Sequence, residues 1–494
     1  MVVTRFPPSP TGFVHVGSLR TALYDYLYAR KHGGRFILRI EDTDQKREVK
    51  GAVENLIETL KWAGLDYDEG PDIGGPHGPY VQSERTALYR QYAAELMEKG
   101  FAYRCFCTPE RLEEMRREQE AHKLAPKYDR RCLALSQAEA EKKIAAREAF
   151  VIRQKIPTAR LGEESVGWAD HVRGEVSFSY ETIDDQVLLK SDGFPTYHLA
   201  NVVDDHLMEV THVIRGEEWL SSTPKHILLY RAFGWGIPEF AHLPLLLNKD
   251  RSKLSKRQGD VAVEDYRKKG YLPEALINFV ALLGWHPGGD ETREIFSLDE
   301  LVEKFSLEKV HKAGAVFDLE KLDWVNWQWR RRKFDATPGE KGDKLIALSA
   351  EFLPNEWRTD REFLKRCVLT AEEKIIKNPV ETPTHIGFYF KESLEIPNEL
   401  LENPKMKVDL ETAKRALAEV LAALENFDRF DSQEALKNHL TALVQKLGLK
   451  NGQVLWPTRV ALTGEAFSPG AFEVLWALGK ERALKKLKMA LSKE

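Results

Sequence analysis

The spacing of hydrophobic residues predicts a strand, a helix and a second strand at the start of this 494-residue chain. Residues 2–6 form a short β-prone run. From Leu19, apolar positions recur every three or four residues through Ala22, Leu23 and Leu27, which predicts a helix beginning near Ser18. Residues 35–40 form the next strand. A strand–helix–strand unit of this length is typical of the start of a parallel sheet.

The α/β pattern is interrupted after about residue 100 and resumes at residue 187. The interruption predicts charged helices over residues 109–123 and 136–148, and strands over residues 151–153 and 176–179. Beyond residue 261 the pattern is helical, including an apolar helix over residues 273–284. Near the C-terminus one helical face is apolar; its positions are Leu410, Ala413, Leu417, Leu421 and Leu424.

Composition limits the possible classes of protein. The net charge is −4, so RNA binding would depend on local basic patches rather than on global charge. No apolar run is long enough to cross a bilayer, and the N-terminus does not resemble a signal peptide. Four cysteines in so long a chain argue against a disulfide framework and for a reducing compartment, the cytoplasm.

The loop before the first helix has the features of a nucleotide site. Prolines stiffen it, and Gly17 leaves room for a flat base against the backbone. The helix that follows presents free N–H groups to an anion, and His15 can donate to a phosphate. Taken as an H-x-G pattern alone, the loop is more typical of a proline-rich turn before a core helix.

The full string is more specific. Pro8-Ser9-Pro10-Thr11-Gly12-Phe13-Val14-His15-Val16-Gly17 resembles the P-S-P-T-G-x-x-H-x-G signature of class I aminoacyl-tRNA synthetases of the glutamate/glutamine type. Ser18 replaces the second histidine of the general class I pattern, so we expect reduced phosphate contact there. Downstream, Lys253-Leu254-Ser255-Lys256-Arg257 resembles the K-M-S-K-S loop of the same class, with Arg257 in place of the last serine.

The resemblance implies roles for both motifs. His15, Lys253 and Lys256 would stabilise charge on the phosphates during catalysis. Mg²⁺ would accompany ATP. The implied nucleotide-binding residues are Gly17, Glu218, Leu246, Lys253, Leu254, Ser255 and Lys256.

Charged residues at predicted strand ends indicate a second binding site. Glu41 begins an acidic stretch after a strand, where open α/β sheets bind ligands, although a capped loop is the alternative. The resemblance places Glu41 at the ammonium group of glutamate and Arg5 at its carboxylate. The implied glutamate-binding set is Arg5, Ser9, Glu41, Tyr197, Asn201, Arg215 and Trp219. The neighbouring Asp204-Asp205-His206 could form a metal cluster or a helix cap, and both stay open.

The resemblance covers the whole chain and implies five segments. They are a Rossmann-like parallel-sheet catalytic domain in two halves (1–100 and 187–245), an α+β insertion that binds the tRNA acceptor end (101–186), a helical stem-contact region with the K-L-S-K-R loop (246–323), and all-helical anticodon-binding domains (324–494). Arg366 is the predicted anticodon contact, with a buried, acid-paired arginine as the alternative. We expect a monomer.

The implied reaction is ATP-dependent ligation of glutamate to its tRNA. A form that also charges tRNA for glutamine, and a non-catalytic tRNA-binding paralogue, are the alternatives. A truncated relative that glutamylates a tRNA base would lack the long helical tail, and a glutamine ligase would carry a β-barrel tail. A generic nucleotidyltransferase would not need the predicted glutamate-binding residues.

The insertion also holds a predicted zinc site. Its ligands are Cys105, Cys107, Cys132 and, as an unusual fourth ligand, Tyr128. Three reduced cysteines without a metal are the alternative. Because the cluster lies outside the nucleotide motifs, any zinc there would be structural.

Overall fold

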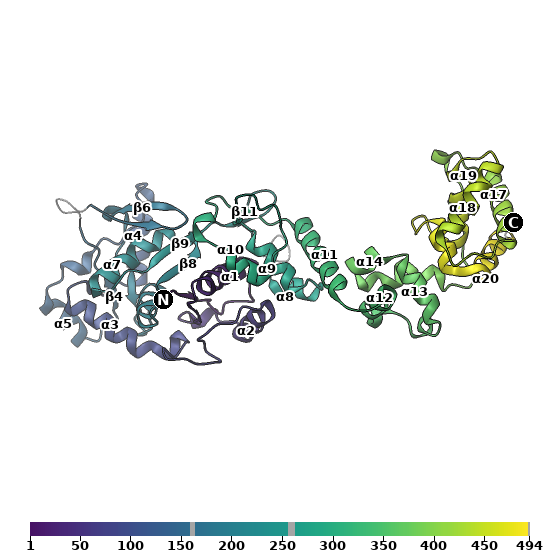
Figure 1. Cartoon of the computed structure of the whole chain (residues 1–494). Coiled ribbons are helices and arrows are strands. Elements are labelled where there is room, and N and C mark those ends of the chain that lie inside the picture. Colours follow the sequence, from purple (N-terminus) through teal and green to yellow (C-terminus); the bar gives the residue numbers. More distant parts are fainter. Residues whose placement is uncertain (159–163, 255–261, 493–494) are drawn as a thin grey trace. The chain divides into compact units, whose positions relative to one another are not determined.

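The computed structural model describes residues 1–158, 164–254 and 262–492 (Figure 1). The chain divides into two compact units, Met1–Asn326 and Trp327–Glu494, and the boundary falls inside helix α11 (Leu319–Ala336). Among the described residues, none of the helices is both long enough and apolar enough to span a membrane.

Two pairs of parallel strands form the centre of the first unit. β1 (Val3–Phe6) pairs with β2 (Arg35–Leu38), and α1 (Val16–Lys31) connects them. On the other side of β1, the Thr211 amide donates to the Val3 carbonyl at 3.0 Å, which places β8 (His212–Gly216) beside β1. β8 in turn pairs in parallel with β9 (Glu239–Leu243). The predicted parallel sheet is present, and its carboxyl ends carry the site residues.

Helices pack around this sheet. They are α2 (Ala52–Ala63), α3 (Thr86–Glu98), α6 (Tyr197–Leu207) and α7 (Thr223–Phe233). The buried side of α1 includes Leu19, Leu23 and Leu27, as the spacing predicts. The helix begins at Val16 rather than near Ser18, because the side chain of His15 caps it.

The insertion contributes to two sheets. β3 (Ala102–Cys105), β4 (Val151–Gln154) and β7 (Val187–Leu189) form an antiparallel sheet beside α4 (Pro109–Ala121) and α5 (Gln137–Ala145). The hairpin of β5 (Ser165–Asp170) and β6 (Gly174–Ser179) instead extends the catalytic sheet, because Asp170 pairs with Phe240 of β9. The hairpin therefore brings Asp170 to the catalytic domain.

The rest of the first unit is mainly helical. β10 (Leu246–Leu247) pairs in parallel with β11 (Ala315–Val316). The helices are α8 (Val263–Lys268), α9 (Pro273–Ala281) and α10 (Leu298–Lys304). The predicted apolar helix over 273–284 corresponds to α9, which is buried through most of its length.

The second unit consists of helices around one continuous core. Along α17, Ala413, Leu417 and Leu424 are buried while Leu410 and Leu421 are partly buried, so the predicted apolar face is the packed face. The helices after α11 are α12 (Lys341–Ser349), α13 (Arg361–Leu369), α14 (Glu372–Lys377), α15 (Thr382–Ile386), α16 (Asn398–Leu401), α17 (Leu410–Glu425), α18 (Gln433–Lys446), α19 (Asn451–Thr463) and α20 (Ala471–Leu491).

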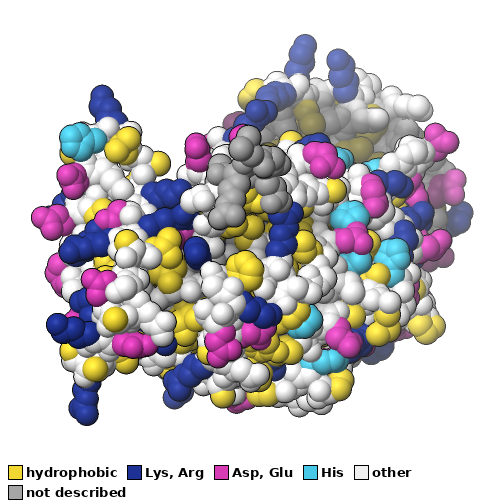
Figure 2. Space-filling model, turned by 90° about the vertical axis from the view of Figure 1, so that its left-hand side faces the viewer, with side chains coloured by type: hydrophobic (Ala, Val, Ile, Leu, Met, Phe, Trp, Pro, Cys, Tyr) yellow, Lys and Arg dark blue, Asp and Glu magenta, His cyan; other side chains and the backbone are white. Residues whose placement is uncertain are grey.

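Basic and acidic side chains are interspersed over the face shown in Figure 2. Lys and Arg, in dark blue, lie next to Asp and Glu, in magenta, over much of this face. This mixture agrees with the net charge of −4, and it means that an RNA contact on this face would use local groups of basic residues.

Candidate active site

His15 is fixed at the N-terminus of α1 by its own side chain. Its Nδ1 atom accepts a hydrogen bond from the backbone N–H of Gly17 at 2.9 Å. A ring nitrogen that accepts carries no proton, so the proton of the neutral imidazole lies on Nε2. His15 can therefore donate from Nε2 to an anion at the helix N-terminus.

His15 and Leu246 both lie beside Gly17. A Cβ atom on Gly17 would come within 3.2 Å of His15 Nδ1 and 4.0 Å of Leu246 Cδ1. The missing side chain at position 17 leaves the space that the imidazole uses. Three residues predicted for the nucleotide site thus meet at one point, although Leu246 is far from the others in the sequence.

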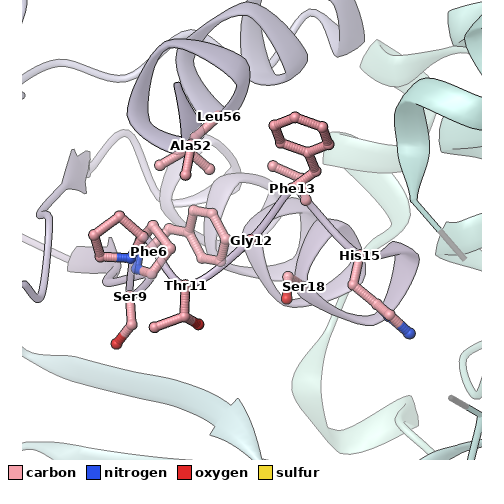
Figure 3. A pocket seen from close by; sticks show the side chains of 12 residues that line it. Phe6, Ser9, Thr11, Gly12, Phe13, His15, Ser18, Ala52 and Leu56 are labelled. Atoms are coloured by element: carbon pink, nitrogen blue, oxygen red, sulfur yellow. The ribbon is translucent and has the colours of Figure 1, made fainter. Parts of the chain in front are cut away.

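The loop before α1 forms one wall of a pocket of about 220 Å³ (Figure 3). The side chains of Phe6, Ala52 and Leu56 supply apolar lining, while Ser9, Thr11 and Ser18 turn their hydroxyl groups to the same side of the loop. Ser18 is exposed and lines this pocket with His15. Its hydroxyl offers a shorter polar group where the general class I pattern has a second histidine.

The described residues that flank 255–261 lie beside the first signature. The amide of Leu254 donates to the carbonyl of Leu246 at 2.9 Å, and Lys253 forms a bridge with Leu247. On the far side, the Val263 amide donates to the Val14 carbonyl at 2.9 Å. Ser255, Lys256 and Arg257 lie outside the described residues. Lys253 and Leu254 therefore lie beside Leu246 and Leu247, and Leu246 lies beside Gly17 of the first signature.

Arg215, at the end of β8, is a buried cation surrounded by neutral groups. Its guanidinium donates to the Tyr197 hydroxyl at 3.0 Å, to Thr223 Oγ1 at 2.8 Å and to His242 Nε2 at 3.2 Å. It also lies 3.4 Å from His226 Nδ1. Within the described ranges, no carboxylate lies at ion-pair distance from Arg215. A buried cation without a counter-charge favours binding of an anion.

The histidines around Arg215 are held neutral. Burial lowers the pKa of His198 to about 3, with help from the positive charges of Lys225 and Arg215. Burial also lowers the pKa of His242 to about 4, although its hydrogen bond to Asp170 works in the opposite direction. Since Arg215 must donate to His242 Nε2, the proton of that ring lies on Nδ1 and is donated to Asp170 at 2.5 Å.

Asp170 is the carboxylate that accepts the hydrogen bond from His242. Burial opposes its charge, but the hydrogen bond from His242 and two backbone amides lower its pKa to about 2. Asp170 comes from the hairpin β5–β6, so the insertion helps to orient the arginine of the catalytic sheet. The sequence analysis missed Asp170, His242, His226 and Thr223, because nothing local marks a residue whose role is to hold another side chain.

Arg5 and Asn201 keep buried donors without a partner. Arg5 is fully buried and donates from Nε to Asp205 at 3.1 Å, while its Nη2 atom has no hydrogen-bond partner in the described structure. The same holds for Nδ2 of Asn201, which is also buried. Glu41 is buried and accepts from Arg39 at 2.9 Å. The site therefore offers two unpaired donors for an anionic group and one buried carboxylate for a cationic group.

Asp204 and Asp205 are neither a metal cluster nor a helix cap. Asp204 accepts from Arg85 at 2.7 Å, and Asp205 accepts from Arg39 at 2.7 Å as well as from Arg5. All of these side chains are buried. The sequence left Asp204 and Asp205 open between a metal cluster and a helix cap, but both form buried ion pairs with arginines far away in the chain. The pair with Asp205 fixes Arg5 in place.

An aromatic wall completes the second site. The rings of Tyr197 and Trp219 lie 4.3 Å apart, and Trp219 is 37% exposed. Burial raises the pKa of Tyr197, and the charges that act on it include those of Arg215, Glu41 and Arg5. Those four predicted residues therefore lie close together. The carboxylate of Glu218 lies against Gly216, where a Cβ atom would come within 2.2 Å of Oε2.

Two further predicted sites lie in other parts of the structure. In the insertion, the Sγ atoms of Cys105 and Cys107 lie 3.3 and 3.4 Å from the Tyr128 hydroxyl, and Cys107 and Cys132 are 3.6 Å apart. In the second unit, Arg366 donates to the Trp476 carbonyl at 3.5 Å. Among the described residues it has no acidic ion-pair partner.

The comparisons with known proteins identify the family. The family model of the class I tRNA synthetases (E and Q), catalytic domain, matches residues 1–324, and an anticodon binding domain matches residues 344–491. The chain therefore belongs to the class I tRNA synthetases of the E and Q family, as the two motifs predict. The parallel sheet with a helical C-terminal part is the fold expected for that family.

Relatives with assigned names match over the full length. The glutamate–tRNA ligase of Chloroherpeton thalassium is 47% identical to this chain, and the match covers 99% of this chain and 97% of that protein. The glutamate–tRNA ligase of Clostridium botulinum is also 47% identical, and the match covers 100% of this chain and 98% of that protein. A crystal structure of a glutamate tRNA ligase from Elizabethkingia meningosepticum, in complex with its amino acid, matches with a TM-score of 0.85 and 38% identity over 100% and 99% of the two chains.

Proposed function

We propose that this protein ligates L-glutamate to tRNA for glutamate through a glutamyl-adenylate, with ATP converted to AMP and pyrophosphate. The observation that carries the proposal is Arg215, a buried guanidinium whose described partners are neutral. A side-chain carboxylate would supply its counter-charge in a bidentate pair. The amide of glutamine brings no charge and turns an NH₂ group towards donors, so the site favours glutamate.

The other end of the amino acid fits the remaining groups. The free Nη2 of Arg5 and Nδ2 of Asn201 are donors for the α-carboxylate. Glu41 is an acceptor for the ammonium group, and Tyr197 and Trp219 cover the aliphatic part of the substrate. A buried unpaired donor costs about 1–3 kcal/mol, so substrate that pairs these groups recovers that cost.

The first reaction step is a displacement at phosphorus. An oxygen of the glutamate α-carboxylate attacks the α-phosphorus of ATP, the bond to the bridging oxygen breaks, and pyrophosphate leaves with its electron pair. His15 Nε2–H and the ammonium groups of Lys253 and Lys256 donate to the phosphates as charge moves onto the leaving group. Bound Mg²⁺ would neutralise part of the phosphate charge.

In the second step, the terminal ribose hydroxyl of tRNA attacks the carbonyl carbon of the adenylate. The bond to AMP breaks, AMP leaves, and the hydroxyl proton is released. The chain provides positioning and charge stabilisation in both steps, with no covalent bond between enzyme and substrate.

The cysteine cluster fits a structural zinc ion. Tetrahedral zinc with bonds of about 2.3 Å to sulfur spaces its sulfur ligands about 3.8 Å apart, close to the 3.6 Å between Cys107 and Cys132. Cys105, Cys107 and Cys132 hold their Sγ atoms within 4.8 Å of one another, with the Tyr128 hydroxyl beside them. No step of the reaction uses this ion, which would hold the insertion together.

Metal analysis tests the zinc assignment. Protein purified without chelators should carry close to one equivalent of zinc, and Cys107→Ser should lose it while Cys367→Ser, in the second unit, keeps it. Less than about a tenth of an equivalent in a protein with normal charging activity would refute the site.

The tRNA partner is supported by the helical second unit, which matches an anticodon binding domain. We propose that Arg366 contributes to reading the anticodon, since its guanidinium has no acidic ion-pair partner among the described residues. The four free cysteines fit a reducing compartment, the cytoplasm, and we propose a monomer. A non-catalytic paralogue is disfavoured because both nucleotide motifs and the glutamate-binding residues are present.

Pyrophosphate exchange with ATP is the decisive experiment, measured with glutamate or glutamine and with or without tRNA. Exchange that requires glutamate, followed by charging of tRNA for glutamate, supports the proposal. Exchange that is absent under every condition would identify a paralogue without activity. Charging of tRNA for glutamine as well would identify the non-discriminating form.

A further inference from the structure

Two histidines and two glutamates meet at the edge of the catalytic sheet opposite to Arg215. His212 and Glu239 are the first residues of β8 and β9, and they are direct partners in the strand register. His171 follows β5, and its amide donates to the Phe240 carbonyl at 2.9 Å. Backbone hydrogen bonds of the sheet therefore fix the positions of all three residues.

The side chains of these residues converge on one point. Nε2 of His171 lies 2.6 Å from Oε2 of Glu239, and Nε2 of His212 lies 3.5 Å from the same oxygen. One potential ligand atom from each of the three residues lies within 4.8 Å of the others. We call these three residues the His–Glu cluster.

The opposite ring nitrogens face polar groups. Thr211 Oγ1 lies 2.8 Å from Nδ1 of His212 and also accepts from the Val3 amide at 2.9 Å. Nδ1 of His171 faces a carboxylate oxygen of Glu308 at 3.7 Å. The 2.6 Å contact is a hydrogen bond in which Nε2–H of His171 donates to Glu239, and the Tyr28 hydroxyl lies 3.4 Å from Nε2 of His212. A metal ion would take the place of this proton. The ring proton of each histidine would then lie on Nδ1, which faces Thr211 in His212 and Glu308 in His171, and each Nε2 lone pair would be directed to the ion. Metal-binding histidines typically have this support behind them.

The charge of the cluster favours a cation. Within the part of the chain that the structure describes, neither Glu239 nor Glu308 forms an ion pair with a lysine or arginine. Two carboxylates thus lie beside two imidazoles, and Glu239 is exposed enough for an ion to enter. The donor set of two imidazole nitrogens and one carboxylate suits Zn²⁺, Ni²⁺, Co²⁺ or Cu²⁺ better than Ca²⁺ or Mg²⁺.

We propose that His171, His212 and Glu239 bind a divalent transition-metal ion, with Glu308 orienting His171 and the fourth position open to water. Bonds of about 2.0–2.1 Å separate tetrahedral ligands by about 3.3 Å. The carboxylate of Glu239, whose side chain is 60% exposed, must withdraw slightly from His171 to reach that spacing. The ion would fasten the β5–β6 hairpin to the first residues of β8 and β9.

The test uses the full chain with its cysteine cluster already loaded with zinc. After unbound zinc is removed by gel filtration, Ni²⁺ is titrated into the protein by calorimetry, and the bound nickel is examined by X-ray absorption. The expected result is one further equivalent with nitrogen and oxygen ligands and no sulfur. No further uptake, or sulfur ligands around the nickel, would overturn the proposal.

Variants assign the site to its residues. His171→Gln and Glu239→Gln should each weaken nickel binding at least about tenfold, and Glu308→Gln should weaken it about tenfold through the orientation of His171. His206→Gln, an exposed histidine stacked on Trp235, is the matched control and should bind nickel as the wild type does. Equal binding by the wild type and by both ligand variants would overturn the proposal. Unchanged pyrophosphate exchange in His171→Gln shows that the variant is folded.

Discussion

The Nδ1 atom of His15 accepts a hydrogen bond from the backbone amide of Gly17, at 2.9 Å. This single contact gives the histidine two separable roles. Nδ1 caps the helix that starts the nucleotide site, whereas Nε2 carries the proton that can reach a phosphate. Substitutions that copy one nitrogen and not the other can measure the two roles independently.

His15→Asn should keep the cap and lose the donor, because the amide oxygen of asparagine can occupy the place of Nδ1. We expect pyrophosphate exchange to fall on the order of a hundredfold and the free energy of unfolding to stay close to that of the wild type. His15→Ala should lose both roles, with a further loss of about 1 kcal/mol in stability. The rate of pyrophosphate exchange measures the loss of the donor, and urea unfolding measures the loss of the cap, in both variants. Equal stability of both variants would show that the cap contributes little.

Arg215→Met should weaken glutamate far more than ATP. Removing the Arg215 guanidinium leaves the side-chain carboxylate of the proposed substrate without its partner, so KM for glutamate should rise at least a hundredfold while KM for ATP changes little. Arg30→Met, which removes a surface ion pair with Asp68, is the control. Similar increases for both substrates would make Arg215 a structural residue.

Acid should destabilise the first unit through its buried histidines. The folded-state pKa values of His198 and His242, about 3 and about 4, lie below the ordinary value of 6.5. The unfolded chain therefore binds more protons between pH 6.5 and 4, so this contribution to stability is complete above pH 6.5 and is lost as the pH falls.

His198→Gln removes one of these titrating imidazoles and should make the free energy of unfolding less dependent on pH. Below pH 6 the wild type should lose about 1.4 kcal/mol per pH unit relative to this variant. Urea unfolding at pH 7, 6 and 5 gives the difference. Parallel pH profiles for the two proteins would show that His198 is protonated in the folded state.

Arg366→Gln should change the ratio of charging between tRNA for glutamate and tRNA for glutamine. Among the described residues, the guanidinium donates one hydrogen bond, to the Trp476 carbonyl at 3.5 Å, so it can turn to a base at little cost. Lys365→Gln, whose ammonium group pairs with Glu340 and Asp343, is the neighbouring control. A charging ratio that stays fixed in Arg366→Gln would remove this arginine from anticodon reading.

Local sequence patterns were sufficient to predict the helices and strands of the catalytic core and the residues that belong to a motif. The spacing of Leu19, Leu23 and Leu27 predicted α1, and the signature around His15 predicted its place at the helix start. Only the exact first residue differed, because a histidine side chain acts here as the cap. Serine, threonine, aspartate and asparagine are the usual caps, so sequence alone does not suggest it.

Contacts between residues that are far apart in the sequence could not be predicted from local patterns. Asp170 meets His242 only because the β5–β6 hairpin pairs with β9. The sequence analysis predicted a strand over 176–179 but no strand at Asp170, and it placed both segments in the insertion. In the same way, Asp205 was left open between two local interpretations, while its actual partners, Arg5 and Arg39, lie more than 160 residues away. Buried ion pairs of this kind depend on tertiary contacts that no short window contains.

The parallel register of β8 and β9 pairs His212 with Glu239 at one edge of the sheet and Arg215 with His242 at the other. The two pairs are three residue steps apart along the strands, a distance of about 10 Å. A shift of one residue in either strand would turn every side chain to the opposite face and would dismantle both edges at once. Over evolution these two strands should therefore accept changes of residue type but no insertion or deletion, so that changes in length within this part of the chain are confined to the connecting loops.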